Sequence, residues 1–152
     1  MNHDFKSYEE IKKFFLGACQ VHDPCCVILF HNQRQTVHRL LAETAAETGR
    51  TLIDQDLSVL PLNEFGCVKF DGTVSSWLSG AMKDVNGKGY IVYLREYHLS
   101  PVKIQSDILN ALIEKSVEGV PFPKNTLIVL GVRREDENAE GLTHTHIVKF
   151  FE

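Results

Sequence analysis

Short apolar runs alternate along the chain with amphipathic segments. The runs at 25–30, 90–94 and 126–132 are apolar at nearly every position, without a regular polar alternation. A strand of this kind is buried on both faces, as in a parallel sheet that is covered by helices on both sides. The segments between the runs place apolar residues three and four positions apart, which is typical of helices. The pattern predicts one α/β domain over 1–152, with an N-terminal helix and lead-in over 1–24.

The order of the expected elements follows from this alternation. We expect helices after Ser7, over Thr36–Thr48, over Val74–Val85 and from Pro101 onward. We expect strands at 25–30, 50–58, 90–94, 126–132 and 146–151, with a short strand or hairpin arm at 65–70. Strands that alternate with helices favour a mostly parallel sheet between two helical layers.

Several helix ends carry local signals. Ser7 is placed to cap the first helix, with Glu10 as its capping-box partner. Thr36 is expected to cap the second helix, and Gly49 to end it. Ser100 and Pro101 open a later helix, because serine caps well and proline suits a first turn.

The composition is that of an ordinary soluble domain. Hydrophobic residues make up 43% of the 152 positions and charged residues 24%, which is enough for one sizeable core. The net charge of −4 disfavours broad binding to nucleic acid or to anionic membranes. The N-terminus is charged and lacks a long apolar stretch, so we expect no signal peptide, no membrane span and a cytoplasmic location.

The cysteines and histidines give weak signals. No two of the cysteines at 19, 25, 26 and 67 have the C-x-x-C spacing of a metal or redox motif. Cys25 and Cys26 lie in an apolar run, so we expect these two to be buried free thiols. His144 and His146 share one face of a strand, but no third metal ligand is indicated. A catalytic pair of Cys67 with a histidine stays an open alternative, with no supporting acid at a recognisable spacing. We therefore expect no metal and no cofactor.

The order of four segments resembles the nucleotide-binding core of the AAA+ ATPases, a branch of the P-loop NTPases. "VILFHNQRQTVHRLLAETAAETGRTLIDQDLS" follows the strand, phosphate loop, helix and strand of that family, and "GYIVYLREYHLSPVKIQSDILNALIEK" follows its second motif and the next helix. "PKNTLIVLGVRRED" is similar to its sensor strand, and "SSWLSGAMKDVNGKGYIVYL" to a helix of MoxR-like members. The resemblance implies a five-stranded sheet with the order 5-1-4-3-2.

The residues that the family needs for phosphoryl transfer are replaced in this sequence. The eight positions of the phosphate loop are His31, Asn32, Gln33, Arg34, Gln35, Thr36, Val37 and His38. Both loop glycines, the lysine and the magnesium-binding hydroxyl of G-x-x-x-x-G-K-[ST] are missing there. In the second motif Arg95 stands in place of the aspartate, and Glu96 remains at the position of the water-activating glutamate. Arg133 occupies the sensor position, and the C-terminal helical lid has no counterpart.

The resemblance thus implies a catalytically inactive AAA+-like domain, a pseudo-ATPase with Glu96 as a vestige. Phosphoryl transfer depends on a metal and a lysine that neutralise the phosphates, and both are lost. Such a domain is expected to act through contact with another protein, either a second copy of itself or a true ATPase. Nucleic acid is an unlikely partner, and no membrane is expected.

Two alternatives use arginines that the layout brings to the carboxyl edge of the sheet. These are Arg34, Arg95, Arg133 and Arg134. Open α/β sheets bind ligands at this edge, so four guanidinium groups there suit a magnesium-independent anion or nucleotide site, or a nucleic-acid surface. The opposite interpretation pairs these arginines with neighbouring acids such as Glu96. Because acids are adjacent in sequence, we favour this second interpretation.

Overall fold

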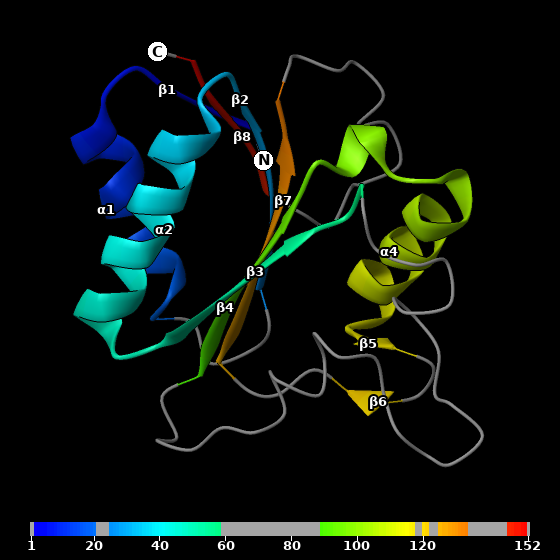
Figure 1. The fold of residues 1–152 in the computed structure, drawn as a ribbon. Helices are drawn as coiled ribbons and strands as arrows, with labels where there is room; N and C mark the ends of the chain where they lie inside the picture. The colour runs from blue at the N-terminus through cyan, green and yellow to red at the C-terminus, as the bar shows by residue number, and fades with distance from the viewer. Residues whose placement is uncertain are drawn as a thin grey trace.

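Six strands form one sheet in the computed structural model, which describes residues 2–20, 25–58, 89–117, 120–121, 125–133 and 146–151 (Figure 1). Every neighbouring pair in this sheet is parallel, and the strand order is β1-β8-β2-β7-β4-β3. The six strands are β1 (Asn2–Phe5), β2 (Cys25–His31), β3 (Thr51–Asp56), β4 (Tyr90–Arg95), β7 (Thr126–Val132) and β8 (His146–Phe150).

Helices cover both faces of the sheet. Helices α1 (Tyr8–Ala18) and α2 (Arg34–Thr48) lie on one face, and α4 (Val102–Glu114) lies on the other (Figure 1). A short 3₁₀ turn, η1 (Tyr97–Leu99), leads from β4 to α4, and β5 (Ser116–Val117) pairs with β6 (Val120–Pro121) in a separate antiparallel ribbon. Each face of the sheet has its own buried apolar cluster, because alternate residues of β2, β4 and β7 point to opposite sides.

The α/β class and the parallel sheet are confirmed, whereas the predicted count of five strands is wrong. Asn2–Phe5 forms a sixth strand beside β8 at one edge of the sheet, where only a lead-in to the first helix was expected. This strand has four residues, of which only Phe5 is apolar, so it contains no apolar run that would predict a strand. The predicted order is therefore incomplete. Without β1, the other five strands have the order β8-β2-β7-β4-β3, which is 5-1-4-3-2 when these five are numbered along the chain.

Two helix ends are as predicted and two differ. The hydroxyl of Ser7 accepts a hydrogen bond from the N–H of Glu10 at 3.2 Å, and Gly49 ends α2 with a left-handed φ of 73°. Thr36 is not the cap of α2, because the helix already begins at Arg34 after Gln33. Helix α4 begins at Val102 with Pro101 as its N-cap, one residue later than expected.

The amino edge of the sheet is held by a tight backbone arrangement. Gly89 has a φ of +93°, and a Cβ there would lie 2.2 Å from the carbonyl oxygen of Asn125. The nearly buried guanidinium of Arg50 donates hydrogen bonds to the carbonyl groups of Cys19, Tyr90 and Asn125. These contacts tie the end of α1 to the starts of β4 and β7.

Other sequence predictions fall outside the described residues. They are the short strand at 65–70, the helix Val74–Val85, and the side chains of Cys25, Cys67, Arg134 and His144. Within the described helices, none is both long and apolar enough to cross a membrane.

Candidate functional site

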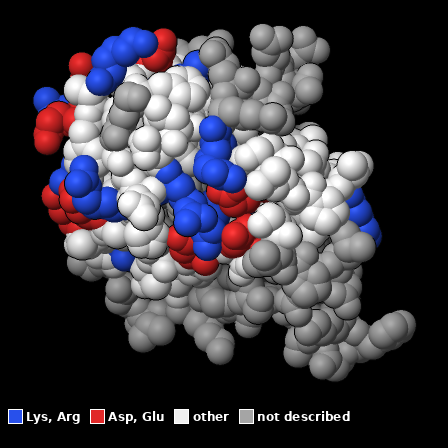
Figure 2. Space-filling view, turned by 45° about the horizontal axis from the view of Figure 1, so that its top comes forward, with Lys and Arg blue, Asp and Glu red and all other residues white. Residues whose placement is uncertain are grey.

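Charged side chains gather at the carboxyl edge of the sheet, where parallel α/β sheets bind their ligands. Arg95 ends β4, Glu96 follows it, Arg133 follows β7, and Asp54 and Asp56 lie at the end of β3. Figure 2 shows basic and acidic side chains side by side on the face turned to the viewer, with uncharged surface next to them. The edge is therefore a surface of mixed charge.

The segment 31–38 does not form one loop. His31 is the last residue of β2 and Arg34 the first of α2, so Asn32 and Gln33 alone connect them. The side chain of Val37, at the position of the family's lysine, is 1% exposed and belongs to the core between α2 and the sheet. A chain that turns within two residues cannot wrap its N–H groups around a phosphate as a glycine-rich loop does.

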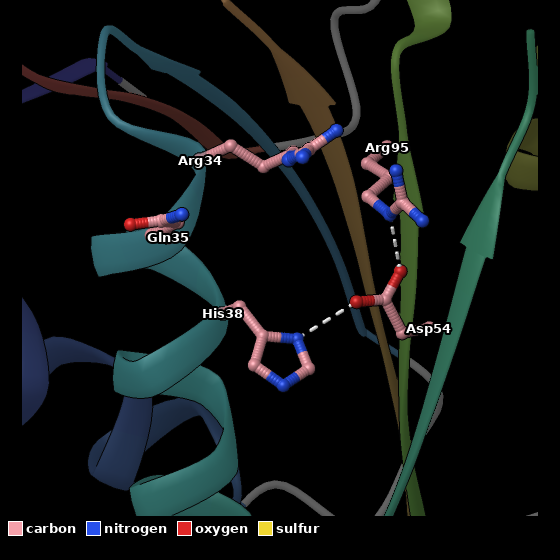
Figure 3. A pocket seen from close by; sticks show the side chains of 5 residues that line it. All are labelled: Arg34, Gln35, His38, Asp54 and Arg95. Carbon is pink, nitrogen blue, oxygen red and sulfur yellow. Dashed lines mark hydrogen bonds and ion pairs between the residues drawn. The ribbon is translucent and has the colours of Figure 1, made fainter.

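Arg95 is held by two carboxylates of the neighbouring strand. Its Nε donates to Asp54 Oδ1 at 2.6 Å, and its Nη1 donates to Asp56 Oδ2 at 3.0 Å. The other oxygen of Asp54 lies 2.8 Å from Nδ1 of His38 (Figure 3). Burial raises the pKa of Asp56, but hydrogen bonds from Ser58 and the charge of Arg95 outweigh this and leave that pKa below its ordinary value.

Glu96 and Arg133 form a second ion pair at the same edge. The Nε of Arg133 lies 2.9 Å and 3.0 Å from the two carboxylate oxygens of Glu96, whose side chain is 4% exposed. Glu96 has a left-handed backbone with a φ of 65°, which is uncommon for a residue with a Cβ. The glutamate that resembles a water-activating residue is thus occupied by an arginine.

Two buried side chains at this edge have unpartnered polar atoms. Within the described part of the chain, neither ring nitrogen of His31 has a hydrogen-bond partner, and nor does the hydroxyl of Tyr93. Burial, followed by the charges of Arg133 and His98, lowers the pKa of His31 to about 4. His31 is therefore neutral at physiological pH. Burial also raises the pKa of Tyr93, so its hydroxyl keeps its proton.

Arg34 differs from Arg95 and Arg133, which both form ion pairs. Arg34, Gln35, His38, Asp54 and Arg95 line a pocket of about 270 Å³ between α2 and the ends of β3 and β4 (Figure 3). The Arg34 side chain reaches from the start of α2 across this pocket toward Arg95 (Figure 3). Within the described residues it makes no hydrogen bond and no ion pair.

The sequence predicted part of this site. It predicted that Arg34, Arg95 and Arg133 lie at one edge. Arg133 pairs with Glu96, as the pairing interpretation expected, whereas Arg95 pairs with Asp54 and Asp56 of another strand. Asp54, His38 as its partner, and Tyr93 were missed. The signal for Asp54 was present, because Asp54 and Asp56 are two residues apart at the end of a predicted strand and so share one face.

The cysteines and histidines bring no further cluster together. Cys26 is buried in the core without a disulfide, as expected for a free thiol. His146 lies near His3 of β1, with ring centroids 5.7 Å apart, and burial lowers the pKa of His146. Among the described residues, no group of three or more His, Cys, Asp or Glu side chains is placed to hold a metal ion.

No model of a protein family matches the chain, and no curated protein is similar enough in sequence to count as a match.

Proposed function

We propose that this chain is an AAA+-like domain without ATPase activity, and that it acts through contact with another protein. The proposal identifies β2, β3, β4, β7 and β8 with the five-stranded core of a P-loop NTPase, in a three-layer arrangement of helices and sheet. Its partner is a second copy of the chain or an active ATPase.

The observation that carries the proposal is the two-residue connection between β2 and α2. ATP hydrolysis needs a backbone cradle and a lysine on the phosphates. Here the connection is too short for the cradle, and the lysine position is Val37, which packs in the core. Replacing Val37 by lysine would bury an ammonium group instead of directing it to a phosphate.

The second motif supports the same conclusion. Arg95 stands where a magnesium-binding aspartate is needed, and its guanidinium engages Asp54 and Asp56. These carboxylates are thus neutralised by a cation that competes with Mg²⁺ for them. Glu96 is in turn bonded to Arg133. The acidic groups of this edge are used to position arginines and not to activate water.

The apolar surface next to this edge favours contact with a protein. Leu99 in η1 is 54% exposed, and Val102 at the start of α4 is 77% exposed. Large apolar side chains that lie beside ion pairs are a common composition of protein interfaces. Ile113, also exposed, lies near the other end of α4 and serves as a matched control.

Two measurements test the proposal. ATP turnover should not exceed that of a boiled sample, and Glu96→Gln should not change it. Cross-linking in a host extract, followed by mass spectrometry, should identify a specific partner or a second copy. Its yield should fall in the Leu99→Ser/Val102→Ser variant and persist in Ile113→Ser. ATP hydrolysis that Glu96→Gln abolishes would refute the inactive assignment, and equal cross-linking in all three proteins would refute the proposed surface.

A further inference from the structure

The pocket between α2 and the ends of β3 and β4 has more hydrogen-bond donors than acceptors. A guanidinium carries five N–H donors and no acceptor. Arg95 uses two of its donors on Asp54 and Asp56, and Arg34 uses none within the described residues. Both oxygens of Asp54 are already engaged, one by Arg95 and the other by His38. Both carboxylate oxygens of Asp54 therefore have partners, whereas most N–H donors of Arg34 and Arg95 have none within the described residues.

The position of Arg34 leaves its N–H donors accessible to a ligand in the pocket. Arg34 belongs to the first turn of α2, where the helix dipole favours negative charge, and the N-cap Gln33 makes no side-chain capping bond. The side chain of Gln35 lines the same pocket and has an amide group that donates. Figure 3 shows the guanidinium groups of Arg34 and Arg95 approaching from opposite walls.

Tyr93, on the same strand as Arg95, has a buried hydroxyl. It has no hydrogen-bond partner in the described part of the chain, although the side chain is fully buried. The charges that act on it include those of Asp54, Arg95 and Arg34. A buried polar group without a partner calls for an explanation such as a water or a ligand. The charges of Asp54, Arg95 and Arg34 therefore act on this hydroxyl, although Tyr93 is not among the residues that line the pocket.

We propose that this pocket binds a small oxyanion, a phosphate or carboxylate group, between Arg34 and Arg95 without a metal ion. Two guanidinium groups provide paired N–H donors that match the spacing of oxyanion oxygens. The volume of about 270 Å³ admits a phosphate group with a small substituent. The proposal concerns a ligand site and does not depend on the protein partner proposed above.

Titration calorimetry of the full chain with inorganic phosphate, in a buffer of low ionic strength, tests the site. We expect saturable binding with a Kd below about 20 mM, and an affinity about tenfold lower in Arg34→Ala. Arg34 is exposed, so its loss should leave folding intact. Arg39→Ala is the matched control: Arg39 lies on the same helix against the ring of Tyr8, and its loss should leave the phosphate affinity unchanged.

Two further arms identify the ligand chemistry. Asp54→Asn removes the one carboxylate that lines the pocket and should strengthen phosphate binding. Acetate in place of phosphate separates the two sources, since an equal affinity indicates a general oxyanion site and a preference for phosphate indicates a phosphate site. Amide resonances of residues 34, 35 and 38 should shift on binding. Absence of saturable binding of either anion, or the same affinity in Arg34→Ala as in the unaltered chain, would overturn the proposal.

Discussion

Replacing His31 by leucine should remove a large part of the acid sensitivity of this fold. The His31 side chain is 1% exposed, and its ring nitrogens have no partner within the described residues. Burial and the nearby charges of Arg133 and His98 lower its pKa to about 4 from an ordinary value of 6.5. Because the folded pKa is the lower one, the unfolded chain takes up the proton first. The stabilising effect of neutral His31 is complete above pH 6.5 and is lost as the pH falls toward 4.

The size of this effect follows from linkage between protonation and folding. With these two pKa values, His31 lowers the free energy of unfolding by about 2 kcal/mol between pH 7 and pH 5, and by about 3 kcal/mol at pH 4. Leucine has a similar volume and does not titrate. At pH 7 the His31→Leu variant should be at least as stable as the unaltered chain, because no hydrogen bond of the ring is lost.

Urea unfolding followed by circular dichroism at pH 7, 6 and 5 measures the effect. The unaltered chain should lose about 2 kcal/mol more than His31→Leu over this range. His38→Gln is the control, because it removes a half-exposed histidine and leaves His31 in place. His146 contributes to acid sensitivity in all three proteins and cancels in the comparison. An equal acid loss in His31→Leu, or a loss of more than about 2 kcal/mol at pH 7, would show that the ring makes contacts we have not recognised.

Four more substitutions, in two matched pairs, test the contacts at the amino edge of the sheet. Gly89→Ala should cost about 2 kcal/mol or more in urea unfolding, because the new Cβ collides with the carbonyl oxygen of Asn125 at a positive φ. Gly17→Ala, where nothing lies within 4 Å of the new Cβ, should instead stabilise helix α1 by about 0.5 kcal/mol. Arg50→Met should cost about 3 kcal/mol, because three carbonyl groups each lose one donor, whereas Arg39→Met on the surface should cost less than about 1 kcal/mol. Equal losses for the members of either pair would refute the corresponding contact.

The central strands could be predicted because their sequences are apolar on both faces. Thr126–Val132 is buried along its whole length, and the structure gives it the bounds that the pattern indicated. Asn2–Phe5 could not be found in this way, because its place in the sheet depends on pairing with β8, more than a hundred residues away. Such a short strand acquires its conformation from its neighbour and not from its own pattern.

The start of α2 shows how tertiary contacts override a local signal. Thr36 is a good capping residue, yet the helix begins two residues before it. Val37 packs inward together with Leu40 and Leu41, on the face of α2 that covers the sheet. Burial of these three side chains stabilises the helix by several kcal/mol, which exceeds the roughly 1 kcal/mol of a capping bond.

The chemistry of the pocket follows largely from the register between β3 and β4. This register pairs Asp56 with Arg95, and Asp54 lies two residues earlier on the same face. This pairing of β3 with β4 places Arg95 between two carboxylates. Both carboxylates are bonded to its guanidinium, which competes with Mg²⁺ for them. Arg34 comes from a helix on the opposite wall and shares none of these bonds. The same register thus bonds both aspartates to Arg95 on one wall, while the guanidinium donors of Arg34 on the other wall are unused within the described residues. The sequence alone does not reveal this difference between Arg95 and Arg34. It depends on the pairing of β3 with β4, which brings the two aspartates to Arg95.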